Sequence, residues 1–213
     1  MRDTYHEELD ALTDRLVEMT RLVRSAISRA TTALLDSDLS LAEGVISGDK
    51  AVDLAHDEIE TSVLDLMARQ QPVATDLRKI VSALRMAGTL ERMGDLAVHV
   101  ARTARRRHPD SAIPPELRDM FLEMGQISER LVTKAGSVIA SHDVATALEL
   151  ESDDDALDKL QRQLFTKILS PSWPHGVESA VDITLAQRYY ERYGDHAVHL
   201  AENIVYLSTG ERP

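Results

Sequence analysis

Two segments of the sequence carry the same acids, the same glycine and the same histidine. ERMGDLAVHVA begins at Glu91 and ERYGDHAVHLA begins at Glu191, and eight of the eleven positions are identical. In each segment Glu, Asp and His stand at i, i+4 and i+8, so on a helix they form one polar stripe. Such a stripe can bind a metal ion when it is buried or faces a second acidic helix. The repeat predicts an internal duplication of the chain.

A second pair of acids precedes each copy of this motif at the same spacing of four residues. If the helices that carry them are antiparallel neighbours, the first set of carboxylates is Asp49, Asp53, Glu91 and Asp95, and the second set is Asp154, Asp158, Glu191 and Asp195. Four carboxylates in close contact cannot all stay ionised without a counter-charge. Oxygen ligands with at most one imidazole favour Mg, Mn, Fe or Ca. They also bind Zn, but are less specific for it. The alternative is that these acids are ordinary surface charges on a solvent-exposed helix face.

Gly94 and Gly194 occur inside the two motifs. A glycine within a helix costs about 1 kcal/mol relative to alanine, so its presence in both copies predicts a close approach of a neighbouring group. Close packing of two helices would account for it equally. His99 and His199 end the stripes, and the residues leave open whether they are ligands or ordinary packed or surface side chains.

Hydrophobic periodicity predicts an all-α protein of two tandem antiparallel three-helix bundles. The six long helices are expected at about 5–35, 38–69, 75–107, 117–142, 143–169 and 178–207. The expected units are 1–109 and 116–213, joined by a linker at 110–115. The expected caps are Asp38 or Ser40, Thr75 and Asp143 at helix starts and Gly210 at the last helix end. An arginine cluster closes the third helix, where cations favour the helix dipole: Arg102, Arg105, Arg106 and Arg107.

Composition narrows the class of protein. The net charge of −12 argues against a nucleic-acid binder and suits a cytoplasmic protein or one that concentrates cations. Cysteine is absent, so thiolate ligands are excluded. The charged start MRDTYHEELD carries no apolar signal segment, and no apolar run is long enough to span a membrane.

The motifs resemble those of the PhoU family, whose pattern is E-R-I-G-D-x-A-x-N-I-A-E. DKAVDLAHDEIE from Asp49, QQPVATDLRKIVSALRMAGTLERMGD from Gln70 and AENIVYLSTG after the second motif extend the resemblance over nearly the whole chain. His99 and His199 depart from it, because the family usually has Asn at these positions. This departure resembles the actinobacterial branch of the family.

The resemblance implies two three-helix repeats whose acidic motifs bind metal ions or metal clusters, here through the two carboxylate sets. It also implies a cytoplasmic, often dimeric, non-enzymatic negative regulator of phosphate uptake and phosphate-starvation signalling. Its implied partners are the ATPase of the phosphate-specific ABC transporter and a sensor histidine kinase. The ion is expected to be Fe, Zn, Mg or Mn. The alternative drawn from the residues is a carboxylate-bridged metal hydrolase or oxidase on a helical bundle.

Overall fold

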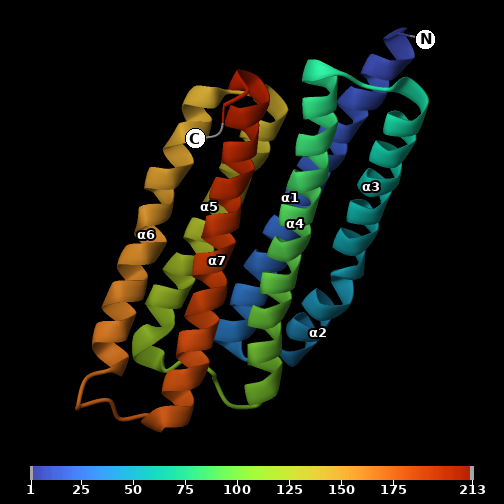
Figure 1. Cartoon of the computed structure of the whole chain (residues 1–213). Helices are drawn as coiled ribbons and strands as arrows, with labels where there is room; N and C mark the ends of the chain where they lie inside the picture. The colour runs from blue at the N-terminus through green and yellow to red at the C-terminus, as the bar shows by residue number, and fades with distance from the viewer. Residues whose placement is uncertain (1, 212–213) are drawn as a thin grey trace.

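The computed structural model describes residues 2–211, and every element in that range is helical (Figure 1). The all-α prediction is therefore confirmed. In chain order the elements are α1 Arg2–Asp36, α2 Leu39–Gly48, α3 Lys50–Gln70, α4 Ala74–Arg107, the 3-10 turn η1 Pro115–Leu117, α5 Arg118–Ser141, α6 Val144–Ile168 and α7 Gly176–Thr209.

Four of these helices form the centre of the molecule. Helices α1 and α4 of the first half pack against α5 and α7 of the second half, while α2 and α3 cover one side and α6 covers the other (Figure 1). Helices α4 and α7 run in opposite directions, as do α6 and α7. The two halves share one apolar core, in which Leu16, Met19 and Val23 of α1 are buried. Each such side chain contributes about 1.5–3 kcal/mol by leaving water.

The helix expected at 38–69 is divided, and this part of the prediction is wrong. Helix α2 ends at Gly48, and α3 begins at Lys50. Asp49 stands between them with helical angles, φ −59° and ψ −30°. Its carbonyl accepts hydrogen bonds from the amides of Val52 at 2.8 Å and Asp53 at 3.1 Å. The interruption places Asp49 at the start of α3, facing α4.

The expected helix caps are confirmed at three positions and wrong at one. The side chain of Asp38 accepts the amide of Leu41 at 2.9 Å and so caps α2. Asp143 caps α6, and Gly210 ends α7 in the left-handed conformation with φ 83°. Thr75 does not cap α4, because the helix starts one residue earlier and its N-cap is Val73 without a side-chain bond.

The halves meet through two matching small-residue contacts between α1 and α5. A Cβ on Gly125 would lie 2.6 Å from Cγ2 of Thr31, and one on Gly136 would lie 2.6 Å from Oγ1 of Thr20. Thr20 and Gly125 are 105 residues apart, as are Thr31 and Gly136. The two contacts therefore exchange equivalent positions, which is the pattern of a local two-fold axis between the duplicated halves.

At one end of the bundle, arginines of α4 bind an acid of α7. The buried carboxylate of Asp182 accepts hydrogen bonds from Arg106 at 2.5 Å and from Arg107. Arg107 also pairs with Glu178 at 2.9 Å. The expected linker nearby is packed rather than free, since Ala112 and Ile113 are 4% and 3% exposed. Arg106 and Arg107 of the cluster thus join the two halves, a role that the helix-dipole interpretation missed.

Candidate metal centre

The first carboxylate set is built where the start of α3 crosses the middle of α4. A Cβ on Gly94 would lie 2.9 Å from Oδ1 of Asp49 and 3.2 Å from Cγ1 of Val52. The missing side chain therefore makes room for the carboxylate of Asp49, and the close approach predicted at this glycine is present.

The acids of this set lie close enough to act on Asp49 electrostatically. Burial, followed by repulsion from Asp53, Asp95 and Glu91, raises the pKa of Asp49 to about 6. A raised pKa means that the ionised carboxylate has too little positive charge or hydrogen bonding around it to compensate its charge. The missing compensation is what a bound cation would supply.

The second set repeats the arrangement between α6 and α7, more tightly. A Cβ on Gly194 would overlap Oδ1 of Asp154 and would lie 2.7 Å from Cδ1 of Leu157. Oδ1 of Asp154 and Oε2 of Glu191 are buried and have no hydrogen-bond partner in the described structure. Buried polar atoms without a partner cost about 1–3 kcal/mol, more when charged, so they point to a ligand that completes them.

Burial raises the pKa of Asp154 to about 7, with further contributions from Asp195, Asp158 and Glu191. Burial also raises the pKa of Glu191, against the effect of the adjacent Arg188. Arg188 binds one oxygen of Glu191, which leaves the other oxygen unpartnered. An all-carboxylate donor set with free buried oxygens fits a hard or intermediate divalent cation.

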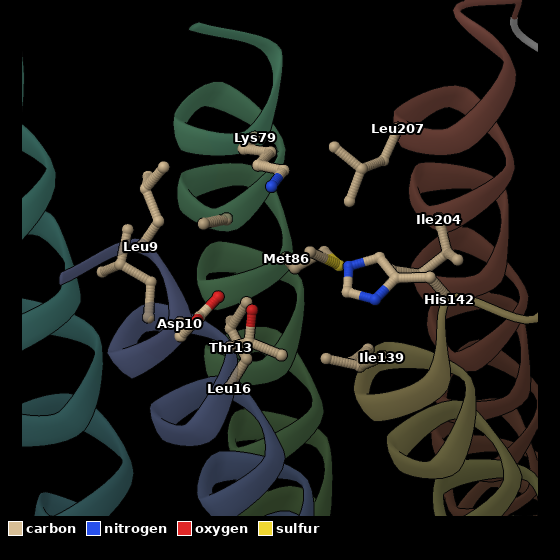
Figure 2. A pocket seen from close by; sticks show the side chains of 12 residues that line it. Leu9, Asp10, Thr13, Leu16, Lys79, Met86, Ile139, His142, Ile204 and Leu207 are labelled. Carbon is tan, nitrogen blue, oxygen red and sulfur yellow. The ribbon is translucent and has the colours of Figure 1, made fainter. Parts of the chain in front are cut away.

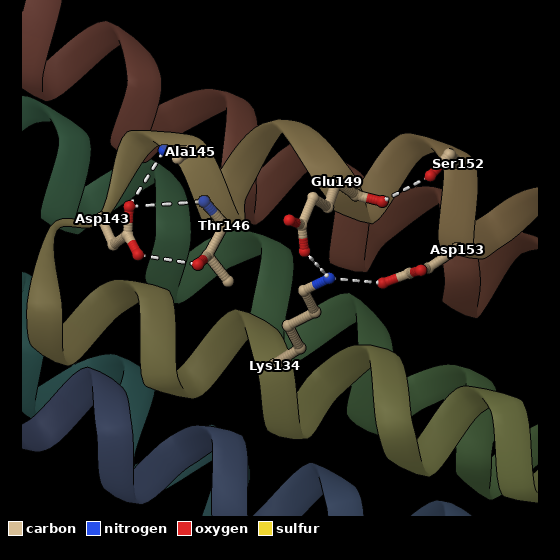
Figure 3. A network of polar contacts seen from close by, with 7 residues as sticks. All are labelled: Lys134, Asp143, Ala145, Thr146, Glu149, Ser152 and Asp153. Carbon is tan, nitrogen blue, oxygen red and sulfur yellow. Dashed lines mark hydrogen bonds and ion pairs between the residues drawn. The ribbon is translucent and has the colours of Figure 1, made fainter.

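A lysine of α5 holds α6 in the orientation that this set requires. Lys134 Nζ donates to Glu149 and to Asp153, each at 2.7 Å, and the Asp143 cap stands at the start of the same helix (Figure 3). These two acceptors lie on the side of α6 that meets α5. Asp154, the next residue, consequently faces α7.

The acids converge without forming a closed cage. In neither set do three ligand atoms lie within 4.8 Å of one another; over the described residues, that criterion selects only His56, Asp57 and Glu60 on α3. Arg92 instead contacts Glu91 at 3.5 Å and Asp95 at 3.1 Å. Binding by either set therefore requires carboxylate rotamers to turn inward, as exposed Asp53 and Asp195 are free to do.

Of the two motif histidines, His99 lies at the contact between α4 and α7, while the ring and ionic neighbours of His199 are on its own helix, α7. The ring of His99 stacks on Tyr189, with ring centroids 5.0 Å apart. His199 lies 6.0 Å from the ring of His196 and 3.9 Å from Glu202. Packing between the halves thus accounts for His99. This agrees with the interpretation of His99 as an ordinary packed side chain, one of the two that the sequence left open.

Sequence reasoning did not identify the hollows that lie outside the carboxylate sets, of which two are lined mainly by apolar side chains. A small cavity of about 50 Å³ is mostly aliphatic, with Lys79, His142 and Asp10 at its edge (Figure 2). An open apolar groove lies at the turn between α6 and α7, where Leu169 and Val177 are 79% and 81% exposed. Exposed apolar patches of this kind mark contacts with other molecules. The sequence signal was the pair of aliphatic residues that flank the PSWPHG break, Leu169 before it and Val177 after it.

Known proteins with similar sequences cover the whole chain. A phosphate-specific transport system accessory protein, PhoU homolog 2 of Mycobacterium tuberculosis, is 47% identical over 100% of both chains. PhoU homolog 1 of Mycobacterium leprae is 46% identical over 100% of this chain and 96% of that protein. The crystal structure of PhoU from Pseudomonas aeruginosa superposes with a TM-score of 0.87 at 30% identity, covering 97% of this chain and 100% of that one.

None of the helices in residues 2–211 is both long and apolar enough to cross a bilayer.

The PhoU domain matches twice, over residues 16–104 and 121–204, so that each match includes one carboxylate set and one motif glycine. This double match confirms the duplication expected from the repeated motif. With full-length similarity to accessory proteins of phosphate-specific transport, the chain belongs to the PhoU family.

Proposed function

We propose that this protein is a negative regulator of phosphate uptake and phosphate-starvation signalling. It acts as a metal-binding helical adaptor between the ATPase of the phosphate-specific ABC transporter and a sensor histidine kinase. The supporting observation is the carboxylate set that is built twice, each time against a helix glycine, in a chain similar over its full length to transport accessory proteins. As the family resemblance implies, it works in the cytoplasm as a homodimer, with repeats 1–109 and 116–213 joined by 110–115.

The proposed metal ligands are the two sets already described: Asp49, Asp53, Glu91 and Asp95, and Asp154, Asp158, Glu191 and Asp195. Fe, Zn, Mg or Mn would supply the positive charge that these carboxylates lack. Asp49 and Asp154 hold the outer helices against the motif helices, and Glu91 and Glu191 contribute from the opposite side. Charge neutralisation at each set would stabilise the packing of an outer helix on the central four.

The groove at the α6–α7 turn supports a protein that works by contact rather than by turnover. Its exposed aliphatic side chains include no member of either carboxylate set. We therefore propose no catalytic residue.

The metal assignment is tested by elemental analysis of untagged protein purified without chelator, beside the double variant Glu91→Gln/Glu191→Gln. We expect metal in the natural protein and loss in the variant, with unchanged helical circular dichroism. Equal metal content in both proteins would remove these acids from the ligand set. Hydrolysis of a phosphate ester that disappears in the variant would favour the metallohydrolase alternative instead.

The regulatory assignment is tested in the source cell by deletion and by co-purification with the transporter ATPase and the kinase. We expect phosphate-responsive genes to be expressed at high phosphate after deletion, and the natural gene to restore repression. Unchanged expression after deletion, together with no co-purified partner, would refute the adaptor function. The metal result and the partner result are independent, so either part can fail alone.

A further inference from the structure

The two carboxylate sets have different electrostatic surroundings, although the motif is repeated. Burial and the charges of Asp53, Asp95 and Glu91 raise the pKa of Asp49, and the charge of Arg102 lowers it. A positive charge therefore acts on Asp49, the acid that lies against Gly94.

The duplicated positions differ in sign at this point. The residue 100 positions after Arg102, in the second motif helix, is Glu202. The counterpart of Lys50, which follows Asp49, is Asp155, which follows Asp154. Asp155 adds a fourth acid to those that act on Asp154. At both positions the second half replaces a cation by an acid.

Direct contacts show the same asymmetry. In the first set Arg92 contacts both Glu91 and Asp95, at 3.5 Å and 3.1 Å. Its counterpart Arg192 makes no ion pair within 4.0 Å with the acids of the second set, all of which the structure describes. Arg188 occupies one oxygen of Glu191, and two buried carboxylate oxygens there stay without a partner. The second set thus has more uncompensated negative charge and more oxygens available to a ligand.

We propose that the two sites fill in a fixed order, in which the Asp154 set binds a divalent cation at lower concentration than the Asp49 set. Arg92, which contacts Glu91 and Asp95, is the built-in counter-charge that weakens binding at the Asp49 set. This inference rests on the proposed function, which makes both carboxylate sets metal sites. Its physical basis is that a cation gains most where negative charge is least compensated and where burial reduces screening. The second set would stay loaded while the first responds to changes in metal concentration.

The test is a titration of metal-free protein with Mn²⁺ alone, with free ion counted by electron paramagnetic resonance and heat measured by calorimetry. The natural protein is compared with Asp154→Asn, Asp49→Asn and Arg92→Gln. Arg105→Gln is the matched control, because Arg105 is also on α4 but pairs with Glu43 of α2, at 3.3 Å. Circular dichroism verifies that each variant is folded.

We expect two binding phases in the natural protein. Asp154→Asn should remove the tighter phase and Asp49→Asn the weaker one, while Arg92→Gln should tighten the weaker phase by roughly three- to tenfold, the effect of one nearby charge. Arg105→Gln should change neither phase. One phase with equal affinities, or loss of the tighter phase in Asp49→Asn, would overturn the filling order but leave the metal sites in place. No Mn²⁺ binding in any protein would refute the metal sites themselves.

Discussion

The backbone of Gly194 lies against the carboxylate of Asp154, so closely that a Cβ on the glycine would overlap Oδ1 of the acid. The same contact exists in the first half, where a Cβ on Gly94 would lie 2.9 Å from Oδ1 of Asp49. Both glycines are inside long helices, where they reduce helix stability relative to alanine by about 1 kcal/mol. The duplicated chain accepts this loss twice because the space holds a carboxylate at each site.

Gly194→Ala should therefore displace Asp154 from its position beside Glu191. We expect metal affinity to fall by about ten- to a hundredfold, the range seen when a residue that positions ligands is changed. The protein should also unfold at lower temperature, because Leu157 is only 2.7 Å from the new Cβ. Calorimetric metal titration and thermal unfolding measure the two effects.

Gly88→Ala is the matched control for this substitution. Gly88 is likewise inside a long helix, α4, and nothing lies within 4 Å of its Cβ position. We expect this variant to keep full metal affinity and to gain about 0.5–1 kcal/mol of stability from the better helix former. Equal metal affinity in Gly194→Ala and Gly88→Ala would show that the motif glycine serves helix packing alone.

The stability of the metal-free protein should decrease as the pH rises from about 4 to about 7. The pKa of Asp154 is raised from 3.8 to about 7, chiefly by burial. Between these values the folded protein keeps a proton that the unfolded chain has lost, so the free energy of unfolding falls with rising pH. Asp49, with its pKa raised to about 6, adds a smaller effect in the same direction.

The measurement is chemical denaturation with chelator present at several pH values. Asp154→Asn should show a weaker dependence on pH over this interval, while substitution of the exposed Asp14 should leave it unchanged. Added metal should reverse the trend, because ion binding favours the deprotonated carboxylates. A natural protein and an Asp154→Asn variant with the same pH dependence would contradict the proposed burial of this acid.

The carboxylate sets could be predicted because their geometry is local. Acids four residues apart share a helix face whatever the tertiary structure, and the repeated Glu91 and Glu191 motifs showed which helices to pair. The break at Asp49 was missed because the apolar rhythm continues through it. Gly48, immediately before the break, was the available local signal.

Contacts between the halves could not be predicted in the same way. The arginines at the end of α4 were explained by the helix dipole, since no local pattern shows that Asp182 of α7 lies beside them. His99 likewise meets Tyr189 only because α4 and α7 run antiparallel across the local two-fold axis. Hydrophobic periodicity predicts which face of a helix is buried. It does not predict which of the other amphipathic helices packs against that face.

Asp182→Ala should separate the ends of α4 and α7. The carboxylate is only 8% exposed and binds Arg106 and Arg107, whereas the Arg106 side chain is 55% exposed and can regain water. We therefore expect a loss of about 1–3 kcal/mol in the free energy of unfolding, below the value for a fully buried pair. Urea denaturation measures it. Glu18→Ala, which removes the exposed pair with Arg21, should change stability by less than about 1 kcal/mol.

Substitutions at Gly125 and Thr31 should be energetically coupled, because the two residues are in close contact. A Cβ at position 125 would lie 2.6 Å from Cγ2 and 2.7 Å from Oγ1 of Thr31. That hydroxyl also lies 2.9 Å from the hydroxyl of buried Tyr190. Gly125→Ala should therefore destabilise the protein by about 1–3 kcal/mol through overpacking.

Thr31→Ala relieves this overlap, so the pair can be examined by a double-mutant cycle. The single variant Thr31→Ala loses the contact with Tyr190 and should cost about 1 kcal/mol. In the double variant the new alanine at 125 fills part of the space that Thr31 leaves, so the combined loss should be smaller than the sum of the single losses. Chemical denaturation of the four proteins gives the coupling energy. Additive losses would mean that α1 and α5 move apart at position 125 without transmitting strain to Thr31. The close contact between Gly125 and Thr31 would then be wrong.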